Sequence, residues 1–178
     1  EEHVLFTSKQ PTPLSGDWDN IELYGENNII SYVDYEYATD GFSGDGTSGS
    51  TFDNLTMLGT LSLTANGIYL TNSSDMIFTN NWISVAGEYG IFSENSPNSV
   101  VNNNEINGSY GTAAISMDYC HNCLFDGNTV TDRPYIGIES RYSDRLTVTN
   151  NNLDLHQYGM DMRDGSTHHI DNNTVTNF

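Results

Sequence analysis

Basic residues are scarce in this sequence. Lysine and arginine total five among 178 residues, whereas aspartate and glutamate total 24, so the formal net charge is −19. A protein this acidic repels the phosphates of DNA and RNA and the headgroups of anionic membranes. Long apolar runs are also missing, because no stretch approaches the ~20 residues of a membrane-spanning helix. We therefore expect neither a nucleic-acid partner nor a membrane span.

Hydrophobic residues make up only 36% of the chain, and asparagine, glycine, serine and threonine take their place. The first ten residues, EEHVLFTSKQ, lack the basic start and apolar stretch of a signal peptide, so a secreted protein would be in a processed form. The acidic, lysine-poor and asparagine-rich composition favours an extracellular or cell-surface location. Four Asn-x-Ser/Thr sequons agree with that location and are glycosylation candidates: Asn54, Asn72, Asn107 and Asn172.

The chain contains an internal repeat. Five segments of 18 residues align without a gap, beginning at residues 67, 90, 114, 137 and 159, which are 23, 24, 23 and 22 residues apart. Residues 41–58 fit the same frame less well, with Leu55 where the others have asparagine, and residues 21–38 fit with a slip of about one residue. A period between roughly 20 and 50 residues is the signature of a solenoid.

Three positions of this 18-residue frame are apolar in all five segments: the second, the twelfth and the seventeenth, which are Ile68, Phe78 and Ile83 in the first segment. The residues around each of them alternate between apolar and polar, with the period of a β-strand. Three short strands per turn predict a parallel β-helix whose coils stack at about 4.8 Å, the strand-pairing distance. We predict one all-β solenoid domain over residues 1–178, with about seven coils of about 21–26 residues each.

The fifteenth frame position is an asparagine in every segment: Asn81, Asn104, Asn128, Asn151 and Asn173. Stacked coils would place these side chains above one another at a bend, where each amide can donate to the carbonyl oxygen of the next. Asparagine also suits a bend because it tolerates left-handed backbone angles. We predict a structural asparagine ladder; the alternative is a row of amides that binds sugar.

The repeated frame of Gly-Ile, Ser, Asn-Asn and Ile, together with GDWDNIEL and NNIISYVDYEYA near the start, resembles the right-handed parallel β-helix repeat family. The resemblance covers nearly the whole chain. That family includes carbohydrate-binding and sugar-hydrolysing proteins, lyases, epimerases and surface proteins, so the resemblance implies the fold and not one activity. It also implies that a substrate groove would run along the outer face of the first strand of each coil.

Two outward columns of that strand hold the candidate chemistry. The third frame position holds Tyr69, Phe92, Ser116, Glu139 and Asp161, and the fifth holds Thr71, Glu94, Asp118, Arg141 and Arg163. In an enzyme, Glu139 and Asp161, with Asp118, would supply the carboxylates that glycoside hydrolysis needs. The substrate-binding residues would be Arg141, Arg163, the exposed rings of Tyr69 and Phe92, and His156 in an adjoining loop. The alternative is that the mixed charges of the fifth column form surface ion pairs that fix the register of the coils.

The segment YGMDMRDGS at 158–166 is faintly similar to the catalytic coil of alginate epimerases. It has Met162 and Arg163 where those enzymes have a Pro-His pair, so the activity does not carry over. A polyuronate would be repelled by a net charge of −19 unless Ca²⁺ bridged the two. We expect no cofactor and no dedicated metal site; the alternative is loose binding of Ca²⁺ by scattered acidic loops.

The two cysteines, Cys120 and Cys123, form a CHNC motif. Such a motif is found in redox pairs, half zinc sites and disulfides. A zinc site needs two further ligands, and no second cysteine pair follows. Both cysteines fall at inward positions that flank one bend, so we predict a disulfide rather than buried thiols, in agreement with an extracellular location.

No amphipathic helix precedes the first coil or follows the last, although the end coils of a solenoid expose unpaired strand edges. We expect either a piece of a longer protein or a subunit that stacks head to tail into a homo-oligomer, filament or sheet. The favoured function is an extracellular structural or adhesive β-solenoid that associates through its open ends. The alternative is a polysaccharide-active enzyme, a glycoside hydrolase or lyase, or a glycan-binding domain that uses the outer face of the first strand.

Overall fold

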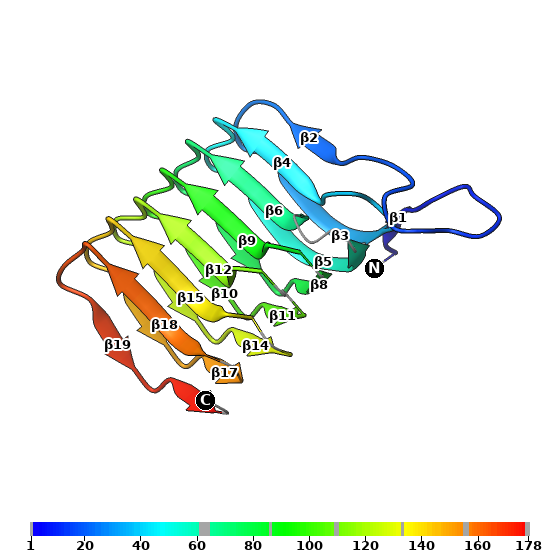
Figure 1. The fold of residues 1–178 in the computed structure, drawn as a ribbon. Helices are drawn as coiled ribbons and strands as arrows, with labels where there is room; N and C mark the ends of the chain where they lie inside the picture. The colour runs from blue at the N-terminus through cyan, green and yellow to red at the C-terminus, as the bar shows by residue number, and fades with distance from the viewer. Residues whose placement is uncertain are drawn as a thin grey trace.

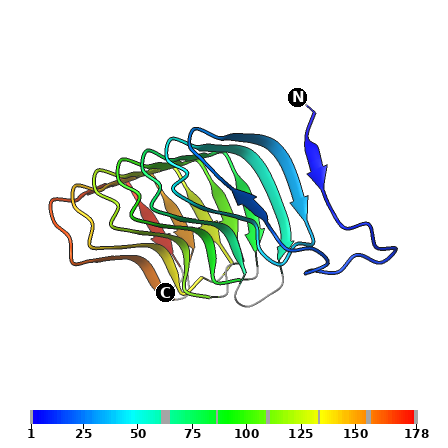
Figure 2. The same cartoon turned by 90° about the horizontal axis from the view of Figure 1, so that it is seen from above.

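The chain forms a parallel β-helix of about six turns. The computed structural model describes residues 2–60, 65–85, 87–108, 111–132, 134–154 and 157–176, and every regular element in these ranges is a strand. None of them is a helix long and apolar enough to cross a membrane. The prediction of about seven coils counts one too many, because the segment before residue 17 adds only β1 (Val4–Phe6). Figures 1 and 2 show this segment diverging from the stack of coils.

The strands form three ladders, one at each side of the coil (Figure 1). The first ladder is a seven-stranded sheet of β2 (Ile21–Leu23), β4 (Phe42–Asp45), β6 (Asn66–Thr71), β9 (Tyr89–Glu94), β12 (Ala113–Asp118), β15 (Ile136–Arg141) and β18 (Tyr158–Arg163). The second contains β7 (Ile77–Thr79), β10 (Val100–Asn102), β13 (Leu124–Asp126), β16 (Thr147–Thr149) and β19 (His169–Asp171). The third contains β8 (Trp82–Val85), β11 (Glu105–Asn107), β14 (Thr129–Thr131), β17 (Asn152–Asp154) and β20 (Thr174–Thr176).

Two longer strands join the second and third ladders into one sheet. They are β3 (Ile29–Glu36) and β5 (Thr51–Thr60), which pair with each other. The first half of β5 pairs with β7 and its second half with β8, while β1 pairs with the second half of β3. The bend that separates two strands in the later coils therefore lies inside a single strand in these two coils.

The hydrophobic core is a column that runs along the helix axis. The strand register stacks equivalent frame positions, so that Ile68 pairs with Ile91 and Ile115 with Ile138. These isoleucines are completely buried, as are the apolar residues at the twelfth and seventeenth frame positions from Phe78 to Leu153. Full burial of such a side chain contributes about 1.5–3 kcal/mol, so the three apolar positions explain why a chain with few hydrophobic residues folds.

The bend before the third strand depends on the fourteenth frame residue. Asn80, Asn103 and Asn150 have φ of 54°, 52° and 56°, and Gly127 has φ of 65°. Glycine and asparagine adopt this left-handed conformation at the least cost. The ladder asparagine follows one position later and does not share the left-handed angle, so the prediction that the ladder residue itself takes that angle is wrong by one residue.

The five asparagines of the fifteenth position stack in one column. In each of the first four, Nδ2 donates to the Oδ1 of the next asparagine, at distances from 2.8 to 3.0 Å. Each accepting Oδ1 also receives the backbone N–H of the asparagine before it. The first four asparagines are no more than 1% exposed. The column ends at Leu55, whose backbone N–H donates to Asn81 Oδ1 at 3.0 Å.

The disulfide lies within one coil. Cys120 and Cys123 are bonded at 2.03 Å, with their Cα atoms 5.7 Å apart. Both residues are buried, at positions that Ser96 and Ser99 occupy in the preceding coil. The bond therefore closes a corner of its own coil and does not join neighbouring coils.

We expect Asn128→Ala to lower the free energy of unfolding by about 1–3 kcal/mol, because it removes the oxygen that accepts the backbone N–H and Nδ2 of Asn104 and the amide that donates to Asn151 Oδ1. The control is Asn152→Ala, which removes an exposed strand amide next to the ladder in the following coil. We expect that change to stay within about 0.5 kcal/mol. Urea unfolding followed by tryptophan fluorescence measures both. Equal losses in the two variants would contradict a stabilising ladder.

Candidate functional site

The outer face of the seven-stranded sheet presents the candidate residues in two columns. One column runs through Tyr69, Phe92, Ser116, Glu139 and Asp161, and the other through Thr71, Glu94, Asp118, Arg141 and Arg163. Neighbours in a column belong to adjacent coils about 4.8 Å apart. The fold thus brings six charged residues together on one face of the sheet: Glu94, Asp118, Glu139, Arg141, Asp161 and Arg163.

Glu139 is buried, with 1% of the residue exposed. Its outward frame position had predicted an exposed carboxylate. Oε2 accepts a hydrogen bond from Ser116 Oγ at 3.1 Å, and Oε1 accepts Arg141 Nε at 3.1 Å together with Arg141 Nη2. An unpaired buried carboxylate would cost several kcal/mol, so these bonds are what permit its burial. Because Glu139 is buried away from solvent and both of its oxygens are occupied, it is better suited to holding Arg141 in place than to transferring a proton to a substrate.

The two arginines pair within their own strands. Arg141 binds Glu139, and Arg163 binds Asp161, in each case two residues earlier in the chain. Hydrogen bonds to these carboxylates raise the pKa of both arginines. Within the part of the chain that the structure describes, no ion pair joins Glu94 or Asp118 to an arginine. The fifth column is therefore not the ladder of ion pairs that its mixed charges had suggested.

Asp118 and Asp161 occupy different environments. Burial raises the pKa of Asp118 above its ordinary value of 3.8, and the negative charges of Glu139 and Glu94 act in the same direction. The backbone N–H of Arg141 donates to Asp118 Oδ1 at 2.9 Å and opposes this effect. The side chain of Asp161 is 13% exposed and paired with Arg163. A carboxyl group whose pKa is raised, as that of Asp118 is, has the property that a general acid needs.

Aromatic rings lie next to the carboxylates in the direction of the N-terminus. Tyr69 and Phe92 stack with ring centroids 4.7 Å apart and an interplanar angle of 12°. Tyr89 lies against Phe92 at 4.9 Å, and burial raises its pKa. Tyr69 remains 39% exposed and offers a ring to solvent.

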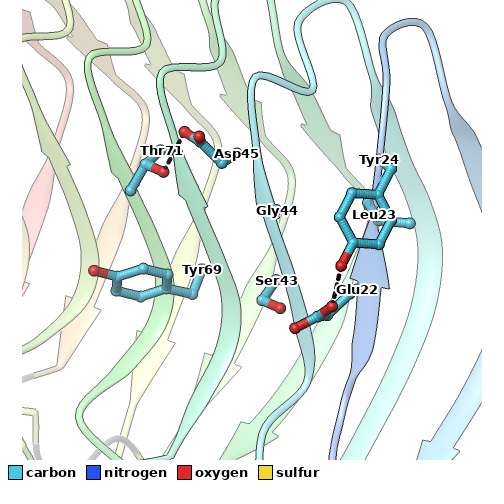
Figure 3. A pocket seen from close by; sticks show the side chains of 8 residues that line it. All are labelled: Glu22, Leu23, Tyr24, Ser43, Gly44, Asp45, Tyr69 and Thr71. Atoms are coloured by element: carbon cyan, nitrogen blue, oxygen red, sulfur yellow. Dashed lines mark hydrogen bonds between the residues drawn. The ribbon is translucent and has the colours of Figure 1, made fainter.

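A hollow of about 400 Å³ lies beyond Tyr69, over β2, β4 and β6. Figure 3 shows Tyr69 on one side of it and Tyr24 with Glu22 on the other, with Gly44 between them. Tyr24 is 79% exposed, and its hydroxyl donates to the Glu22 carboxylate. The lining contains two carboxylates and no basic side chain: Glu22, Leu23, Tyr24, Ser43, Gly44, Asp45, Tyr69 and Thr71.

Two exposed tyrosine pairs flank the carboxylates at opposite ends of the strands. Tyr135 and Tyr158 lie where β15 and β18 begin, with ring centroids 5.5 Å apart. Tyr119 and Tyr142 follow the last residues of β12 and β15, and their rings stack at 4.9 Å and 17°. The second pair was missed in the sequence, although the change from Asn72 and Asn95 to tyrosine at the sixth frame position was a visible signal.

Tyr119 and Tyr142 adopt an unfavourable backbone conformation, with φ of 52° and 54°. The left-handed region costs an ordinary residue roughly 1–2 kcal/mol. An aromatic pair contributes about 0.5–1.5 kcal/mol beyond the area it buries. The stack therefore does not offset the conformational cost of the two tyrosines. Asn72, Asn95 and Asp164 are left-handed at the same frame position, so the fold imposes the conformation and the choice of tyrosine is what needs an explanation.

The remaining candidates lie apart from this face or outside the described ranges. His156 is among the residues that the structure does not describe. Of the sequon asparagines, Asn72 and Asn172 are exposed, whereas Asn54 and Asn107 are partly buried. Within the described ranges, no group of three or more His, Cys, Asp or Glu side chains is arranged to hold a metal ion.

Comparisons with known proteins bear on the fold. A search of curated proteins finds no match to this chain. Among solved structures, one from Parabacteroides merdae ATCC 43184, titled as a "putative glycosyl hydrolase", aligns with a TM-score of 0.54 at 10% sequence identity. The alignment covers 88% of this chain and 80% of that one. At this identity the likeness concerns the fold alone.

The family comparison covers nearly the whole chain. The model of the right-handed β-helix region matches residues 17–116 and 40–178. These matches include every strand of the seven-stranded sheet, and with it the whole candidate site. The chain therefore belongs to the right-handed β-helix family.

Proposed function

We propose that the outer face of the seven-stranded sheet binds a glycan and hydrolyses one of its glycosidic bonds. The proposal rests on one observation, the buried ion pair of Glu139 and Arg141 beside the half-buried Asp118. Burying a carboxylate on the outer face costs stability. A surface with a purely structural role would have no need of a buried carboxylate. Shifted carboxyl groups concentrate at catalytic sites.

The proposed roles follow from these environments. Asp118, whose pKa is raised, donates its proton to the leaving glycosidic oxygen. Asp161, paired with Arg163, is the second carboxylate, which either activates water or attacks the anomeric carbon. Glu139 fixes Arg141, whose side chain is 37% exposed and within reach of a sugar hydroxyl. Glu139 is thus a positioning residue in this scheme, and Asp118 and Asp161 are the catalytic pair.

The charge of the protein favours a neutral glycan. With a net charge of −19, the protein repels a polyuronate over the whole length of its surface. The hollow between Tyr24 and Tyr69 adds two further carboxylates and no cation. Carboxylates accept hydrogen bonds from sugar hydroxyls, and exposed rings pack against the apolar face of a pyranose.

An extracellular location is part of the proposal. The disulfide between Cys120 and Cys123 supports it, because such bonds form and persist in oxidising compartments.

We expect Glu139→Gln to lower kcat/KM for cleavage of a neutral polysaccharide by about 10–100-fold, because the neutral amide no longer holds the Arg141 guanidinium by charge. Release of reducing ends from arabinoxylan, galactomannan and mixed-linkage β-glucan measures it. Glu105→Gln, an exposed change on another face of the coil, is the matched control and should have no effect. Full activity in Glu139→Gln would contradict the proposed site.

The pH dependence of cleavage should report Asp118. The rate is highest where Asp118 is protonated and falls as pH rises through its folded pKa, which burial raises above 3.8. Asp118→Asn should remove this pH dependence and lower the rate by about 10²–10⁴-fold. The free energy of unfolding, measured against pH, provides a second test. Because the pKa of Asp118 is raised in the folded protein, its contribution to the free energy of unfolding is fully present below pH 3.8. That contribution is lost as pH rises through the folded pKa. Identical pH profiles in the wild type and Asp118→Asn would contradict this role.

Association through the end coils stays the second candidate function. Exposed apolar side chains at the edge strand β1 favour it, with Val4 58%, Leu5 55% and Phe6 40% exposed. An edge strand of this kind is a template for pairing with another chain. A structural or adhesive component would use such contacts to build a filament or sheet.

We expect Leu5→Pro to prevent this association, because proline cannot donate to a strand ladder. Light scattering at physiological salt should then give the mass of one chain for the variant and a larger mass for the wild type. Thr12→Pro, in an exposed loop between two prolines, is the control. A monomeric wild type would rule out this function and leave the proposed hydrolase untouched.

A further inference from the structure

The corner after the first strand holds a pair of exposed aromatic rings next to the candidate catalytic residues. Tyr119 follows Asp118 directly, and Tyr142 follows Arg141. The two residues are 41% and 46% exposed, with their rings stacked 4.9 Å apart. The pair therefore borders the carboxylates at the end of the strands opposite to Tyr135 and Tyr158.

The backbone at this corner does not require tyrosine. Asn72 and Asn95 hold the same position in the preceding coils, and their N–H groups donate to the next coil at 2.9 and 3.0 Å, as those of Tyr119 and Tyr142 do at 2.9 Å. All four residues have left-handed φ angles between 51° and 55°. The fold thus imposes the conformation, and asparagine satisfies it at less cost.

Tyrosine also gives up a side-chain hydrogen bond at this corner. Asn72 donates to Asp45 at 2.7 Å, and Asn95 donates to Asn72 at 3.0 Å, so the asparagines continue a ladder along the surface. Tyr119 stands where a third asparagine would donate to Asn95. The sequence departs from the local preference in the two coils that contain Asp118, Glu139 and Arg141, and such departures are expected at functional positions.

We propose that Tyr119 and Tyr142 form a stacking platform for one sugar ring of a neutral glycan. The C–H face of a pyranose packs on an exposed aromatic ring, while its hydroxyls remain free to reach polar groups at the edge. Here those groups are Asp118 and the partly exposed Arg141 guanidinium. This inference rests on the proposed function and adds a binding subsite to it. A glycan held here and over the carboxylates crosses the corner between the first and second ladders.

The test is the double variant Tyr119→Asn/Tyr142→Asn in the full chain. Affinity electrophoresis and calorimetry with arabinoxylan, galactomannan and mixed-linkage β-glucan measure binding. We expect about tenfold weaker binding, the size of one lost aromatic contact. The melting temperature should equal or exceed that of the wild type, because asparagine suits the left-handed angle. Tyr119→Phe/Tyr142→Phe keeps the rings and should bind within about threefold of the wild type.

A matched control is Tyr37→Asn, which removes another left-handed tyrosine, with φ of 63°, after β3 and away from the seven-stranded sheet. It should leave glycan binding unchanged. If the Tyr119→Asn/Tyr142→Asn variant binds as tightly as the wild type, or loses stability without losing affinity, the platform is overturned and the hydrolase stands. If the wild type binds none of the three polysaccharides, the platform and the proposed function both fail.

Discussion

Backbone pairing between successive coils is the constraint on which the rest of this structure depends. Each frame position lies above and below its own equivalent at the strand spacing of about 4.8 Å. A residue that pairs well with a copy of itself is therefore favoured, which explains the asparagine ladder and the stacked rings of Phe52 and Phe78. Charged residues face the opposite problem, because like charges in register repel. Arg141 and Arg163 are in register, as are Glu139 and Asp161, and each arginine is neutralised by the acid of its own strand.

The repeated frame made most of the fold predictable. Because the side chains of a strand alternate between its two faces, the apolar second, twelfth and seventeenth positions indicated which residues face the core. The right-handed β-helix and its parallel pairing are confirmed. The first coil was less predictable, because β1 pairs with β3 without completing a turn. The sequence also did not indicate that β3 and β5 run unbroken through the bend. Both strands keep a left-handed residue there, Tyr32 and Asn54, as the coils with two separate strands do.

The candidate site was predictable in its placement and less so in its chemistry. Frame position alone put Asp118, Glu139 and Asp161 on one outer face. Burial of Glu139 was not predictable, because it depends on Ser116 in the coil before and on the rotamer of Arg141. The carboxylate that pairs with each arginine was equally unpredictable, because an arginine side chain can reach either an acid in the next coil or the acid two residues earlier in its own strand. The strand pattern does not indicate Tyr119 and Tyr142, because they lie beyond the strand ends and their significance depends on the conformation of the corner.

Because the coils stack in register, the length of the binding face can change independently of the residues that carry its chemistry. One coil of about 23 residues adds one strand to each ladder and lengthens the outer face by about 4.8 Å. The residues proposed for catalysis lie on β12, β15 and β18, whereas the hollow near Tyr24 and Tyr69 lies over β2, β4 and β6, with β9 between the two. Duplication or loss of the coil that contains β9 would move these two regions apart or together by one strand spacing. Evolution of this fold could thus change the length of glycan that the protein spans without altering any residue that touches the scissile bond.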